Sequence, residues 1–162
     1  MENEKLQKLG ELMYDSICTM FSDNDILYEK DDENLTVVTE LTGEDLPMRL
    51  TTKVYPDKQN VTIVSTMPFR IPPEKRAELT AAIAVANYGM LYGGFELDWE
   101  KCRIRYRLSM SYVDSMLGKG LFYKMTFVSL NTIDDYNDKF FMISQGNLSL
   151  KKFTEEEMSK NS

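Results

Sequence analysis

The 162-residue sequence contains no histidine. Because histidine is the commonest general base and a frequent zinc ligand, its absence excludes Ser-His-Asp and Cys-His catalysis and most catalytic zinc sites. Cysteine is scarce as well. Cys18 and Cys102 lie far apart without a CxxC pair, and two thiols are too few for a disulfide framework. These absences argue against an enzyme, and we expect no metal and no cofactor.

Long hydrophobic runs are also missing. The most apolar stretch, residues 79–91, is shorter than the roughly 20 residues that cross a bilayer, and its centre is mostly alanine. Residues 1–5 lead into a polar helix rather than into the apolar core of a secretory signal. These features predict a cytoplasmic protein that makes no membrane contact.

The charge balance is acidic. Asp and Glu number 26 against 19 Lys and Arg, which gives a formal net charge of −7. Because nucleic-acid binding rests largely on neutralising phosphates, this balance predicts no nucleic-acid partner. The length and the 43% hydrophobic content fit one globular domain. We expect that domain over residues 1–146, followed by a flexible C-terminal tail over 147–162.

Apolar periodicity predicts the order of helices and strands. Spacings of three and four predict helices over residues 2–22 and about 117–144, and a further helix follows Pro72-Pro73 and ends at Gly93-Gly94. Period-two alternation predicts five strands, over residues 35–41, 49–55, 61–67, 95–99 and 102–108. Residues 26–28 are either a short strand or a return of the chain to the core. The order α-β-β-β-α-β-β-α predicts an α+β fold with an antiparallel five-stranded sheet packed with helices.

The sequence from Phe95 to Leu108 predicts a strand register. It alternates apolar and charged residues on both sides of Glu100-Lys101. A reversal there, through two or four residues, aligns Leu97 with Ile104 and places every apolar side chain on one face. The charged residues then meet as two structural ion pairs, Glu96 with Arg105 and Asp98 with Arg103.

Two other polar residues are candidates for contact with a ligand or a partner. The same register places Gly94 opposite Arg107, which therefore has no facing carboxylate. This arginine either holds a carboxylate or phosphate group of a ligand, or is solvated or reaches Glu96 diagonally, which we favour. Asn87 either contacts a ligand or ties the end of its helix to the following loop. We favour the second role, because a buried amide needs partners.

Four segments resemble the YbjN family: residues 67–76 (MPFRIPPEKR), 87–88 (NY), 94–98 (GFELD) and 104–107 (IRYR). Members of that family are described as bacterial sensory transduction regulators, and the family is similar in fold to the chaperones of type III secretion. The resemblance implies the fold of small acidic cytoplasmic dimers that hold an unfolded effector segment. Glu100-Lys101 departs from the family, in which a turn containing glycine is usual.

Three functional hypotheses remain. The first is a non-enzymatic protein-binding domain, chaperone-like or regulatory, that acts as a homodimer and binds a polypeptide segment. Eleven methionines agree with it, since methionine forms adaptable binding surfaces as well as filling cores. The alternative is a small-ligand domain that senses anions in a signalling pathway through Arg107 and one face of the sheet. An enzyme that relies on Asp, Glu, Lys or Tyr alone ranks third.

Overall fold

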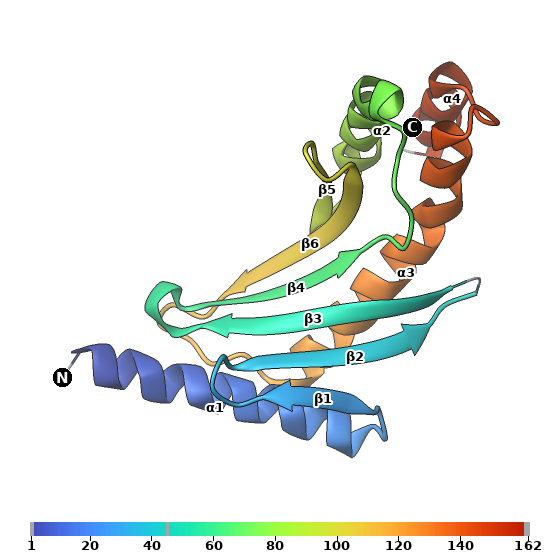
Figure 1. Ribbon diagram of the computed structural model, residues 1–162. Helices are drawn as coiled ribbons and strands as arrows, with labels where there is room; N and C mark the ends of the chain where they lie inside the picture. Colours follow the sequence, from blue (N-terminus) through green and yellow to red (C-terminus); the bar gives the residue numbers. More distant parts are fainter. Residues whose placement is uncertain (1, 45, 161–162) are drawn as a thin grey trace.

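One open antiparallel sheet organises the chain. The computed structural model describes residues 2–44 and 46–160, and within them six strands have the spatial order β1-β2-β3-β4-β6-β5 (Figure 1). The strands are β1 (Tyr28–Asp31), β2 (Thr36–Thr42), β3 (Pro47–Tyr55), β4 (Asn60–Thr66), β5 (Gly94–Asp98) and β6 (Arg103–Ser111). The strands β1 and β5 therefore form the two edges of the sheet. The α+β fold with an antiparallel sheet is confirmed.

The number of strands corrects the expectation of five. The additional strand is β1, which pairs with β2 from Tyr28↔Thr39 to Asp31↔Thr36. The hydroxyl of Thr39 also donates to the carbonyl of Leu27, at 2.7 Å. Because three of the four β1 residues are exposed, the segment has no apolar alternation that the sequence could reveal.

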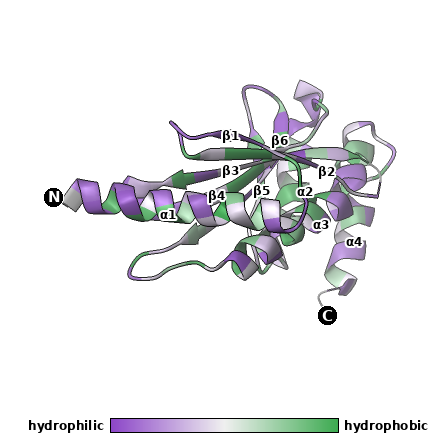
Figure 2. Ribbon diagram, turned by 90° about the horizontal axis from the view of Figure 1, so that it is seen from below, coloured by the Kyte–Doolittle hydropathy of each residue, from purple (hydrophilic) through white to green (hydrophobic). Residues whose placement is uncertain are grey.

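Four α-helices lie within the described residues, together with two short 3₁₀ turns. They are α1 (Glu2–Asp23), α2 (Arg76–Tyr88), α3 (Lys119–Ser144), α4 (Leu150–Lys160), η1 (Pro56–Lys58) and η2 (Pro73–Lys75). Hydrophilic and hydrophobic segments alternate along α1 (Figure 2), as expected for a helix with one buried side. Its residues Met13, Ile17 and Phe21 form one apolar core with β2, β3 and β4.

A second and larger core lies under α2, α3 and α4. Phe95, Phe140 and Phe153 are buried there, and the rings of Phe95 and Phe140 meet edge to face at 5.0 Å. The side chains of the sheet that alternate with the two cores are half-buried or exposed, and they form a polar open face. The helices thus cover one side of the sheet and leave the other side available to solvent or to partners.

The C-terminal segment differs from the flexible tail that was expected over 147–162. Residues 150–160 form α4, and residues 161–162 lie outside the described residues. The helix is docked because Phe153 is fully buried against Phe140 and Tyr136, with ring centroids 6.1 and 6.5 Å apart. Its apolar and buried positions follow a spacing of three and four, so one face is turned to the core.

Candidate functional site

The hairpin of β5 and β6 has the predicted register, with Glu96 opposite Arg105 and Leu97 opposite Ile104. The strands end at Asp98 and begin again at Arg103, so the connection is the four-residue alternative. Cys102 takes a left-handed backbone conformation in this loop (φ 52°). Both Cys18 and Cys102 are free thiols and half-buried.

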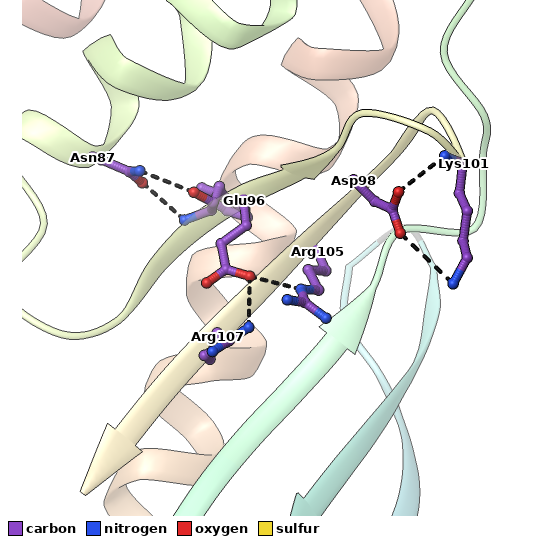
Figure 3. A network of polar contacts seen from close by, with 7 residues as sticks. Asn87, Glu96, Asp98, Lys101, Arg105 and Arg107 are labelled. Atoms are coloured by element: carbon purple, nitrogen blue, oxygen red, sulfur yellow. Dashed lines mark hydrogen bonds and ion pairs between the residues drawn. The ribbon is translucent and has the colours of Figure 1, made fainter.

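Asn87 ties the end of α2 to the edge strand β5 (Figure 3). Its side-chain amide donates to the carbonyl of Phe95 at 3.0 Å, and its side-chain oxygen accepts from the N–H of Phe95 at 2.8 Å. In an antiparallel ladder the N–H and C=O of one residue point to the same side. The groups that Asn87 occupies therefore point away from β6, and the carboxamide caps the outer edge of the sheet at Phe95.

The loop between α2 and β5 lies close to the sheet, and a glycine allows this close approach. Gly93 has a positive φ of 63°, and a Cβ placed on it would collide with the hydroxyl oxygen of Tyr106. That hydroxyl donates to the carbonyl of Tyr92 at 3.0 Å. Only glycine combines this backbone conformation with so close an approach.

Glu96 binds two arginines on the open face of the sheet. One of its oxygens accepts from Arg105 at 2.7 Å and from Arg107 at 3.0 Å (Figure 3). Arg107 therefore reaches Glu96 diagonally while it lies opposite Gly94 in the register. All three side chains are about two-fifths exposed, at 40–41%, so water screens these pairs.

Asp98 does not form the ion pair that was expected with Arg103. The two residues are partners in the register, but no ion pair joins them in the described part of the chain. The Asp98 carboxylate instead accepts from the N–H of Lys101 at 2.9 Å, and the Lys101 ammonium lies 3.8 Å away. The four-residue loop explains why Asp98 binds Lys101, because the loop places Lys101 over the end of β5.

The free edge at β1 lies between two hollows. The first is on the open face, has a volume of about 270 Å³ and is lined by Leu27, Tyr28, Glu29, Val38, Glu40 and Arg49. The second, of about 450 Å³, lies beside the end of α1 and is lined by Ser22, Asp25, Ile26, Leu27 and Tyr28. Leu27 belongs to both hollows and is 89% exposed. A strand edge presents unpaired N–H and C=O groups, and here it also has a hollow for side chains on each face.

A third hollow of about 800 Å³ lies along the first half of α1. Its apolar lining is Leu6, Leu9 and Leu12 of the helix and Met116 of the loop before α3, and its polar lining is Lys5, Lys8, Gln59, Asp114 and Ser115. Leu12 and Met116 are both more than half exposed. The N-terminal end of α1 projects beyond the sheet in both views (Figures 1 and 2), so this apolar strip is open to solvent.

The most strongly perturbed acid joins α4 to α3. The Glu157 carboxylate is 3% exposed and accepts from Tyr136 at 2.7 Å, Lys139 at 2.8 Å and Lys160 at 3.0 Å. Burial acts to raise the pKa of Glu157, but these three donors outweigh it and hold the pKa at about 2. Burial and the bond to Glu157 raise the pKa of Tyr136. The carboxylate is ionised and shared among donors at neutral pH, so its role is to anchor the helix.

Across residues 2–44 and 46–160, no three or more Asp, Glu, Cys or His side chains converge as metal ligands would. Over the same described residues, no helix is both long and apolar enough to cross a membrane.

No pattern in the sequence indicates the β1 hollows or the Glu157 cluster. Ile26, Leu27 and Tyr28 are too short a run to define a period, and their importance comes from Arg49 on a distant strand and Ser22 on α1. Glu157 ends a run of three glutamates that is typical of a solvated segment. Its burial depends on Lys139 and Tyr136, which only the tertiary structure brings to it.

Solved structures share this fold at low sequence identity. One is a chain of the HopA1–SchA chaperone–effector complex, with a TM-score of 0.57 and 13% identity over 79% of this chain and 95% of that chain. Another is YbjN of E. coli, described as "a putative transcription regulator", with a TM-score of 0.55 and 10% identity over 83% of this chain and 90% of that chain. The fold is therefore the small α+β fold that a chaperone complex and a regulator also contain.

The family is identified by its sequence profile. Residues 14–142 match YbjN, described as "Putative bacterial sensory transduction regulator". This match spans most of the sequence, and the chain belongs to the YbjN family. A search of curated proteins finds no match. The matched residues end before α4.

Proposed function

We propose that this chain is a non-enzymatic protein-binding domain of the cytoplasm, chaperone-like or regulatory, that acts as a homodimer and binds an extended polypeptide segment. The observation that carries the proposal is the free β1 edge with a hollow on each side. A chain that adds to a sheet edge gains main-chain hydrogen bonds, and pockets for alternate side chains provide specificity. Relatives described as a regulator and as part of a chaperone–effector complex support the same class of function.

The two edges of the sheet are not equivalent, which supports binding at β1. At β5, Asn87 already occupies the outward N–H and C=O of Phe95. Since β5 has only five residues, that cap removes about half of the outward main-chain groups the strand offers. Among the described residues no side chain caps the β1 edge in this way, and the exposed Leu27 lies beside it.

The hollows define the chemistry of the segment. On the α1 side, Ile26, Leu27 and Tyr28 provide apolar walls that favour an apolar side chain. On the open face, Arg49 lies 3.2 Å from Glu40 and 3.5 Å from Glu29, so a polar or charged side chain fits there. Alternate residues of a strand point to opposite faces. We therefore expect a segment in which apolar and polar residues alternate.

A test places a photo-crosslinking amino acid at position 27 in one variant and at position 91 in a matched control. Leu91 is 83% exposed, nearly as much as Leu27, but it lies beside the capped β5 edge. We expect a crosslinked polypeptide at position 27 and none at position 91 when each variant is expressed in the native host. Equal crosslinking at both positions would refute binding at β1, and no crosslinking at either would refute polypeptide binding.

The homodimer is proposed through the apolar strip of α1. In the strip of Leu6, Leu9, Leu12 and Met116, the last two are more than half exposed and the first two half-buried. The strip is suited to pairing with a second copy, because burying it removes apolar surface from water. Light scattering should report twice the mass of one chain. Leu12→Glu should give a single-chain mass with an unchanged circular dichroism spectrum. A single-chain mass for the wild type at high concentration would contradict the dimer.

A further inference from the structure

A separate hollow lies on the open face of the sheet, away from the β1 edge. It has a volume of about 350 Å³ and is lined by Tyr55, Lys58, Asn60, Thr62, Arg107 and Ser109. Volumes of this size are common in small-molecule sites. The lining contains two cations and no carboxylate, although the whole chain carries more acids than bases. The hollow is therefore a local positive site on an acidic protein.

The guanidinium of Arg107 is only partly used by the protein. Its Nη2 donates to Glu96 at 3.0 Å, and Glu96 also accepts a hydrogen bond from Arg105. The Nε of Arg107 is buried and has no acceptor among the described residues. Because one carboxylate is shared by two arginines, the positive charge is not fully balanced. A guanidinium with donors to spare favours an anion that accepts several hydrogen bonds.

A second positive charge lies at the other end of the hollow. The ammonium of Lys58 is 5.6 Å from the centroid of the Tyr55 ring, and that of Lys53 is 5.3 Å from the same ring. Neither lysine forms an ion pair within the described residues. The hydroxyls of Thr62 and Ser109 and the amide of Asn60 add uncharged donors between the two ends.

We propose that this hollow binds a phosphate group. A phosphate carries close to two negative charges and three acceptor oxygens at neutral pH, which matches two cations and a row of neutral donors. A carboxylate carries one charge and two acceptor oxygens, so it would satisfy fewer of these donors than a phosphate does. The Tyr55 ring forms one wall, so an aromatic ester of phosphate gains contact area that the free ion lacks.

The test follows backbone amide signals by NMR while sodium phosphate, phenyl phosphate or sodium acetate is added at constant ionic strength. We expect saturable shifts at residues 58–62 and 107–109 with both phosphates and a much weaker response to acetate. Tighter binding of phenyl phosphate would assign the site to a phosphate ester, and equal binding would assign it to the free ion. An affinity for acetate as high as for phosphate would overturn the proposal, as would the absence of saturable shifts.

Three variants separate this site from general attraction to positive charge. Lys58→Gln removes one cation without breaking any ion pair of the described residues, and Arg107→Gln removes the other. Each should weaken phosphate binding about tenfold or more, since charge-assisted hydrogen bonds are lost. Arg103→Gln is the matched control, because Arg103 lies on the same strand but outside the hollow, and it should change the affinity less than twofold. Unchanged binding by the Lys58→Gln protein, or an equal loss in the Arg103→Gln protein, would refute the site.

Discussion

Replacing Asn87 tests the cap on the β5 edge directly. The Asn87→Ala variant loses two hydrogen bonds at once, those to the N–H and the C=O of Phe95. A typical bond contributes about 0.5–1.5 kcal/mol net, so the two together stabilise the fold by about 1–3 kcal/mol. Alanine is a better helix former than asparagine, so the substitution also stabilises α2 by up to about 0.7 kcal/mol at this position.

A matched substitution isolates the contribution of the cap. Asn131 is an exposed residue of α3, so Asn131→Ala measures the gain in helix propensity alone. We expect the free energy of unfolding in urea to be about 1–3 kcal/mol lower for the Asn87→Ala protein than for the Asn131→Ala protein. Asn87→Asp should be worse still, because it places a carboxylate oxygen against the Phe95 carbonyl.

The same variants report on assembly as well as stability. An uncapped β5 edge offers free main-chain groups to another chain, so the Asn87→Ala protein should form larger species in light scattering as its concentration rises. The reasoning is refuted if Asn87→Ala and Asn131→Ala have equal unfolding free energies, or if Asn87→Asp is as stable as the wild type.

The remaining predictions concern α3 and α4. Phe153→Ala should lower the unfolding free energy by about 3–5 kcal/mol because the ring is fully buried. Phe141→Ala, at a ring that is 45% exposed, should lower it far less. Rapid amide hydrogen exchange throughout wild-type α4 would contradict the docking of this helix. Because the Glu157 pKa falls from 4.5 to about 2 on folding, the wild type should lose stability as the pH drops through that range. The urea midpoint of Glu157→Gln should vary less there, and parallel pH profiles would refute this role. Asn137→Leu should raise the unfolding free energy by about 1–3 kcal/mol, since neither buried amide atom has a partner among the described residues; a lower urea midpoint would show that the amide is satisfied.

The sequence predicts those parts of the structure in which a period is visible. From Phe95 to Leu108, the alternation of apolar and charged residues determines the register, because a slip of one residue would bury the charges. The diagonal contact of Arg107 with Glu96 follows from that register once Gly94 is placed opposite. Asn87 could also be interpreted from its place at the end of a helix, although the exact partner, Phe95, required the structure.

The features that were missed depend on contacts between distant parts of the chain. The strand β1 consists mainly of exposed residues, so it is stabilised by pairing with β2 rather than by an apolar face. Helix α4 includes a run of acidic residues whose last member is buried only because Lys139 and Tyr136 meet it. Arg107 lies on β6 and Lys58 in the turn η1, so no local pattern could place them in one hollow.

The unequal borders of the sheet also limit how copies of the molecule can associate through their strands. A sheet with two bare borders can add molecules without end and grow into a fibre, because each new copy exposes another border. Here the Asn87 carboxamide stands where the next molecule would attach at Phe95. Growth through the bare border can therefore join two molecules edge to edge, and it stops there.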